Sequence, residues 1–254
     1  MVTSIVFIDL CYTARQPTSA QRYPHKTCGA KPLSTSIVTM NKFLQWLCAL
    51  LPNARCRQQP HVNSQTDRTS VTLEQQLHAL AKLGLILNNG ITVDDLLCSW
   101  DRKDFENQPY DTLLIMLGSE VEREPWGRNV CDRAWNFDVE SIEDTGSYVT
   151  IVRNLCRVAG MPDLVSDLED FVDIDDETAW LKYIINGQQR HFEIAVNNDW
   201  ADPETVSTIM RDIERDGKRF YAKDNGQASI WFYLDKVNAD KLNALTGNAL
   251  KINE

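Results

Sequence analysis

Alternation of apolar and polar side chains is the clearest pattern in this chain, and it lies in the last third of the sequence. Over residues 180–196 the two kinds alternate on both sides of Asn186-Gly187. An Asn-Gly pair favours the positive φ angles that a two-residue type I′ turn requires. We therefore predict a β-hairpin that pairs Leu181 with Phe192.

A second pair of strand-like runs flanks Asn225-Gly226. With the turn centred on these two residues, Phe220 pairs with Trp231. Both faces of this hairpin carry apolar side chains, which indicates either burial between other elements or a surface that binds a partner.

Apolar positions at helical spacing surround the two hairpins. The segment 72–75 has the pattern of a capping box and opens a helix that we expect to end near residue 87. Thr145 is the expected N-cap of a helix that ends at Gly160, and Asp202 caps another that begins with proline. The other expected elements are helices over residues 92–100, 109–118 and 238–246 and a strand over residues 134–140.

The order of these elements predicts an α+β fold. Its C-terminal module is ββαββα, whose two β-hairpins build an antiparallel sheet on which the helical N-terminal part packs. We interpret residues 71–254 as a single domain, with a helical part over 71–128 and a sheet-containing part over 129–254. Residues 1–70 are interpreted as a disordered extension or linker that contains a short amphipathic helix over 41–51.

The chain has no apolar run of about 18 residues, so no membrane span is expected. Lys42 precedes a short apolar run that resembles a signal sequence, but no small-residue cleavage site follows it. Met40 is an alternative start, with residues 1–39 as an upstream extension. We expect a cytoplasmic protein.

The chain has seven cysteines, and no two of them are spaced as C-x-x-C. A disulfide scaffold or a zinc site is therefore not expected. We interpret these residues as reduced thiols, with Cys98 and Cys156 buried on helices as small hydrophobic side chains. Neither a metal nor a cofactor is predicted.

Charge is distributed unevenly along the sequence. Residues 1–70 contain eight Lys and Arg against two Asp, a net charge of +6, whereas the remainder contains 18 Lys and Arg against 34 Asp and Glu, a net charge of −16. A body with this charge repels nucleic acid phosphates and attracts basic partners. We therefore predict a basic protein partner and no nucleic acid.

Two acidic stretches, over residues 138–144 and 163–177, are the candidate binding surface, and tryptophans near them are candidate anchors. The predicted partner-binding residues are Trp135, Asp138, Glu140, Glu143, Asp144, Asp173, Asp175, Asp176 and Trp231. Calcium binding and a pair of acid/base carboxylates are alternatives, although the D-x-[DN]-x-[DN]-G loop is absent. A solvated loop that compensates helix dipoles is the purely structural interpretation.

No motif in the sequence defines a reaction. A Gly-rich phosphate loop, H-E-x-x-H and G-x-S-x-G are all absent. A dyad of Cys131 with His191, or of Cys156 with His78, would form only if folding brought the two side chains together.

Three segments resemble a family of uncharacterised bacterial proteins. They are W-N-F-D-V-E-S-I-E-D-T-G-S-Y over residues 135–148, N-N-D-W-A-D-P over 197–203 and R-F-Y-A-K-D-N-G over 219–226. The resemblance covers most of residues 72–247 and implies no catalytic residue. In size, acidity and α+β character the chain is also similar to immunity proteins of bacterial toxin systems.

Three functional hypotheses follow from these observations. The first is a non-enzymatic acidic interaction protein, such as an immunity or inhibitor protein that binds a basic bacterial toxin. The second is an enzyme of unknown reaction that uses an acidic cleft. The third is a structural accessory protein that forms a homodimer through Phe220, Trp231 and Tyr233.

Overall fold

The computed structural model describes residues 71–253. The predictions for residues 1–70, including the helix over 41–51, lie outside the described residues. Among the helices from residue 71 onward, none is both long and apolar enough to cross a membrane.

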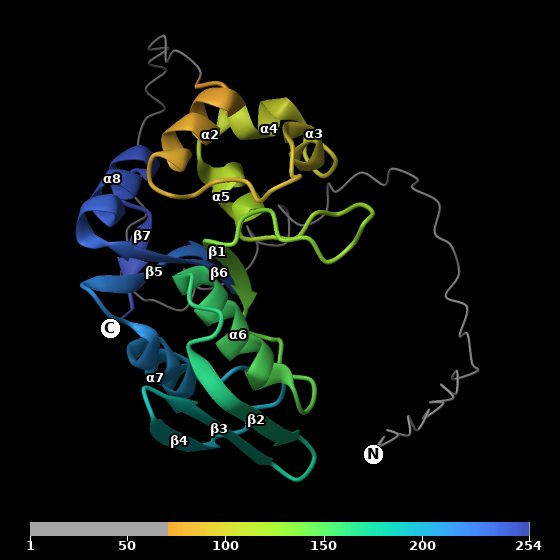
Figure 1. Cartoon of the computed structure of the whole chain (residues 1–254). Helices are drawn as coiled ribbons and strands as arrows, with labels where there is room; N and C mark the ends of the chain where they lie inside the picture. The colour runs from red at the N-terminus through yellow and green to blue at the C-terminus, as the bar shows by residue number, and fades with distance from the viewer. Residues whose placement is uncertain (1–70, 254) are drawn as a thin grey trace, which may run out of the picture. The chain divides into compact units, whose positions relative to one another are not determined.

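Four helices come first in the described chain, and after them strands are interspersed with three further helices (Figure 1). The helices are α2 (Leu73–Ala81), α3 (Val93–Leu96), α4 (Arg102–Asn107), α5 (Asp111–Leu117), α6 (Ser147–Ala159), α7 (Pro203–Ile213) and α8 (Lys236–Thr246). The strands are β1 (Ala134–Asp138), β2 (Val165–Asp173), β3 (Thr178–Ile185), β4 (Gln188–Ile194), β5 (Lys218–Asn225), β6 (Ala228–Asp235) and β7 (Leu250–Ile252). This composition confirms the predicted α+β class.

Both predicted hairpins form, but they belong to two different antiparallel sheets. One sheet has the strand order β1-β6-β5-β7 and the other has the order β2-β3-β4. The expectation of one sheet built from both hairpins is therefore wrong. The separation arises because each hairpin pairs with a further strand, β1 beside β6 and β2 beside β3.

The first hairpin has the predicted register, with Leu181 opposite Phe192. Its turn residues Asn186 and Gly187 have φ angles of 52° and 74°, as a type I′ turn requires. In the second hairpin Phe220 lies opposite Tyr233, two residues from its predicted partner. A shift of two leaves every side chain on its predicted face.

The sheet β1-β6-β5-β7 is covered on both faces. Ile230 and Phe232 of β6 pack in a cluster with the N-terminal helices, and Phe220 and Tyr233 pack in a second cluster with α6, α7 and β3. Figure 1 shows α6 and α7 between this sheet and the sheet β2-β3-β4. Because Phe220 and Tyr233 are buried, the face proposed for homodimerisation is part of the core.

Helices α2 and α3 begin as predicted and end earlier, whereas α5 begins two residues later than expected. The capping box of Thr72 and Gln75 is formed, and α2 ends at Ala81 instead of near residue 87. Three residues after Ala81, Gly84 adopts a φ angle of 82°, a left-handed conformation that cannot continue the helix. The short helix α4 was not predicted from the sequence.

Substitution of Gly118 by alanine is expected to destabilise the contact between α5 and β1. A Cβ at Gly118 would lie 2.6 Å from the backbone nitrogen of Asn136, and that nitrogen donates a hydrogen bond of 2.8 Å to the Gly118 carbonyl. Since backbone cannot move aside cheaply, we expect a loss of about 1–2 kcal/mol in the free energy of unfolding, measured by urea denaturation. Glu122→Ala is the control, because Glu122 is exposed in the segment after α5 and its side chain forms no hydrogen bond or ion pair within the described residues.

Candidate functional site

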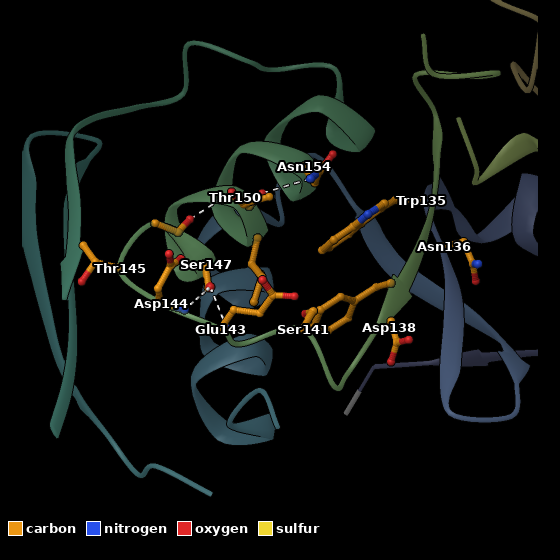
Figure 2. Close-up of a pocket in the computed structure, with 13 residues that line it drawn as sticks. Trp135, Asn136, Asp138, Ser141, Glu143, Asp144, Thr145, Ser147, Thr150 and Asn154 are labelled. Carbon is orange, nitrogen blue, oxygen red and sulfur yellow. Dashed lines mark hydrogen bonds between the residues drawn. The ribbon is translucent and has the colours of Figure 1, made fainter. Parts of the chain in front are cut away.

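A cavity of about 510 Å³ opens between β1, the loop that follows it and the first turns of α6 (Figure 2). We call it the acidic pocket. Its lining includes four of the predicted residues, Trp135, Asp138, Glu143 and Asp144. The structure therefore brings these four residues together, while their binding role stays a prediction.

An aromatic pair forms one wall of the acidic pocket. Trp135 and Phe137 are two residues apart on β1, so their side chains share one face of the strand. Their rings stack with centroids 4.6 Å apart. Figure 2 shows Trp135 directed from β1 toward α6, and Trp135 is only partly buried, so part of its surface is open to the pocket.

The carboxylates of the pocket come from the loop between β1 and α6. Ser147 Oγ accepts hydrogen bonds from the backbone nitrogens of Glu143 (3.2 Å) and Asp144 (3.4 Å), which folds this loop over the start of the helix. The carboxylates of Glu143 and Asp144 are exposed, and within residues 71–253 they have no hydrogen bond or ion pair. No Lys, Arg or His from that part of the chain lines the acidic pocket.

Of the other predicted residues, Glu140 and Trp231 do not line the pocket, and Glu140 shares a hydrogen-bond donor with Asp138 of the lining. Asp138 and Glu140 both accept hydrogen bonds from Gln227 Nε2, which ties the end of β1 to the turn between β5 and β6. Trp231 lies opposite Trp135 on β6 and is partly buried against the second core cluster.

The second acidic stretch forms a strand and a turn instead of a solvated loop. Asp173 ends β2, and its Oδ1 accepts a hydrogen bond of 3.0 Å from the nitrogen of Asp176 in the turn to β3. At the neighbouring position the Val172 nitrogen donates to Thr145 Oγ1, 3.1 Å away. The two acidic stretches therefore meet where Thr145 contacts β2.

Asp170 holds the start of α6 in place. It lies on β2 and is 8% exposed. Its carboxylate accepts hydrogen bonds from the backbone nitrogens of Gly146 (2.7 Å), Tyr148 (2.8 Å) and Val149 (3.1 Å). These are donors that the first turn of a helix leaves without partners. The expectation that Thr145 caps α6 is therefore wrong, because the cap comes from a distant strand.

Neither proposed Cys/His dyad is formed. Cys131 is buried in the first core cluster and Cys156 in the second, whereas His191 stacks on Trp180 and contacts Glu193 at 2.9 Å. Burial raises the pKa of the Cys131 thiol and raises the pKa of Cys156 to about 11. Both thiols are therefore protonated at neutral pH, which is the unreactive form.

Two further expectations concern cysteine and metal. Cys98 is exposed, not buried as predicted, while Cys156 is buried as predicted. Across the described helices and strands, no group of three or more His, Cys, Asp and Glu side chains is arranged to hold a metal ion.

Comparison with known proteins adds no relative. No protein family model, curated protein or solved structure matches this chain. The resemblance noted from the sequence stays a prediction.

Proposed function

We propose that this chain is a non-enzymatic interaction protein whose acidic pocket binds a basic protein partner. The observation that carries the proposal is the pairing of a partly open tryptophan ring with carboxylates that lack basic neighbours among the described residues. Glu143 and Asp144 supply negative charge, and the ring of Trp135 supplies a flat apolar surface.

A lysine or arginine side chain has the chemistry that this pocket fits. Its charged group would be placed near carboxylates, and an aromatic face attracts a cation within about 6 Å of the ring centroid. The long apolar stem of lysine or arginine would cover the open part of Trp135. Aromatic anchors of this kind contribute strongly to protein interfaces.

An immunity or inhibitor protein directed at a basic bacterial toxin is the class of function that we propose. Charge complementarity speeds the encounter between such partners and weakens with salt. The net charge of −16 after residue 70 supports this interpretation. It predicts a basic protein that co-purifies at low ionic strength and dissociates at high ionic strength.

An arginine-rich peptide is a suitable probe for the pocket, with binding to the full chain followed by calorimetry. We compare the wild type with Asp138→Asn/Glu143→Gln/Asp144→Asn, which removes three charges from the acidic pocket. The expected result is a dissociation constant about tenfold higher, which corresponds to about 1.4 kcal/mol.

A second triple variant, Glu122→Gln/Glu124→Gln/Asp163→Asn, removes the same charge from exposed positions outside the pocket. We expect it to bind like the wild type to within about twofold, because these charges do not line the pocket and salt screens exposed charges. Equal weakening in both variants would show that net charge alone attracts the peptide, and the pocket would lose its proposed role.

A further inference from the structure

Cations without carboxylate partners gather at one place in this acidic chain. Of the 18 Lys and Arg after residue 70, ten form ion pairs with described carboxylates and eight do not. Three of these eight, Lys82, Arg133 and Lys218, line a single cavity of about 300 Å³. We call this cavity the basic pocket.

The fold explains why three residues so far apart in sequence converge. Lys82 is the C-cap residue of α2, Arg133 directly precedes β1, and Lys218 is the first residue of β5. The starts of β1 and β5 both lie beside the end of β6, since Ala134 pairs with Phe232 and Lys218 pairs with Asp235. All three cations therefore lie at the same end of the sheet.

Arg133 is positioned by the C-terminal end of α6. Its Nη1 donates to the Val158 carbonyl at 3.4 Å, and its guanidinium lies over Gly160. A Cβ at Gly160 would clash with Nη1, so only glycine leaves room for this arrangement. A guanidinium has five N–H donors, and the remaining ones are available to an anion.

The charge balance of the basic pocket is positive although the chain as a whole is negative. Its described lining contains three cations and one carboxylate, Asp235, so the lining has a net charge of +2. Both Asp235 oxygens are engaged at the start of α8, where they accept hydrogen bonds from the nitrogen (2.8 Å) and Nδ2 (3.0 Å) of Asn238. Within the described residues, no ion pair joins Asp235 to any of the three cations.

We propose that the basic pocket binds the phosphate group of a small phosphorylated molecule. A phosphomonoester carries a charge of about −1.5 to −2 at neutral pH, which matches the net charge of the pocket better than a carboxylate does. The fork of Arg133 suits two oxygens of one phosphate, and the lysines act as point charges. The cavity also exceeds the size of the phosphate group, which leaves space for the esterified part of the molecule.

Calorimetric titration of the full chain tests the proposal with three probes: inorganic phosphate, glycerol phosphate and glycerol. We expect both phosphates to bind and glycerol not to bind. Comparison of the two phosphates distinguishes free phosphate from a phosphate ester as the natural ligand. Tighter binding of glycerol phosphate would show that its organic part occupies the rest of the cavity. Failure of both phosphates to bind would overturn the proposal.

Variants locate the binding in the basic pocket. Arg133→Gln is expected to raise the dissociation constant for phosphate about tenfold, the loss of one charge-assisted contact. Arg153→Gln is the matched control, because Arg153 is exposed on α6, lacks an ion pair in the described chain and lies outside the pocket. Equal weakening in the two variants would place the phosphate elsewhere, for instance on the basic residues before position 71.

Gly160→Ala provides a test that leaves the net charge unchanged. It displaces the Arg133 guanidinium and is expected to weaken phosphate binding about as much as Arg133→Gln does. Circular dichroism checks that the variant is folded. Should it unfold, Lys218→Gln replaces it with the same expectation, and unchanged phosphate binding in a folded variant would contradict the proposal.

Discussion

Replacement of Asp170 by alanine is expected to lower the free energy of unfolding by about 3 kcal/mol at neutral pH. The carboxylate accepts three backbone hydrogen bonds at the start of α6, and each bond to a charged group contributes about 1.5–3 kcal/mol when taken singly. The loss is smaller than their sum because water can enter at Gly146, which is only partly buried. Urea denaturation measures it.

Glu169→Ala is the control for this substitution, because Glu169 is the neighbouring residue on β2 and points to solvent. Its ion pair with Lys182 is exposed, and such pairs contribute at most about 1 kcal/mol. A loss in Asp170→Ala no larger than that in Glu169→Ala would show that α6 does not depend on its cap from β2.

The second large effect concerns Asp95, which is 2% exposed at the start of α3. Its Oδ2 accepts hydrogen bonds of 2.8 Å from the nitrogen and hydroxyl of Thr92, and its Oδ1 accepts one of 2.9 Å from Arg123 Nε. Asp95→Asn removes the charge that both partners stabilise, and we expect a loss of about 2–3 kcal/mol at neutral pH.

The effect of Asp95→Asn should depend on pH. The hydrogen bond from the Thr92 nitrogen, followed by those from the Thr92 hydroxyl and Arg123, holds the pKa of Asp95 well below its usual value although burial opposes this. Stabilisation by a carboxylate with a lowered pKa is complete above its unfolded pKa of about 3.9 and is lost as the pH falls toward the folded pKa. The difference in stability between wild type and variant should therefore shrink as the pH falls from about 5 to 2.

Asp94→Asn is the control for the pH series. Asp94 lies in the same helical turn and is exposed, so its effect should be small at every pH. A wild-type advantage over Asp95→Asn that stays constant down to the lowest pH would contradict the assigned role of the Asp95 charge.

Local turn and capping chemistry made much of the fold predictable from sequence. The first hairpin has the expected register because Asn186 and Gly187 both adopt positive φ angles. The second is displaced by two residues because its turn is at Gly226-Gln227, and Gly226 alone has a positive φ. Asp202 caps α7 as expected, through the nitrogen of Thr205 at 2.9 Å.

Interactions between distant residues account for what the sequence did not reveal. β2 was missed because Asp170 occupies an inward position that hydrophobic patterning expects to be apolar, and its partners lie more than 20 residues earlier. The three-residue strand β7 is too short to show a period. Two sheets formed where one was expected because strand pairing is set by residues far apart in the chain.

The same reasoning applies to the candidate site. Trp135, Asp138, Glu143 and Asp144 could be grouped from the sequence because they lie within ten residues of one another. Phe137 could have been added, because a W-x-F pattern in a strand places both rings on one face. Ile151 and Asn154 of α6 complete the lining, and no local signal points to them.

Arg133 of the basic pocket lies just before β1, and Asp138, the nearest carboxylate of the acidic pocket along the chain, is the last residue of that strand. At a rise of about 3.3 Å per residue, these two positions are about 17 Å apart. The Debye length at physiological ionic strength is about 8 Å, so roughly two screening lengths separate the opposite charges. The length of β1 thus lets a strongly acidic chain keep a cationic site whose attraction for anions is not cancelled by the carboxylates of the acidic pocket.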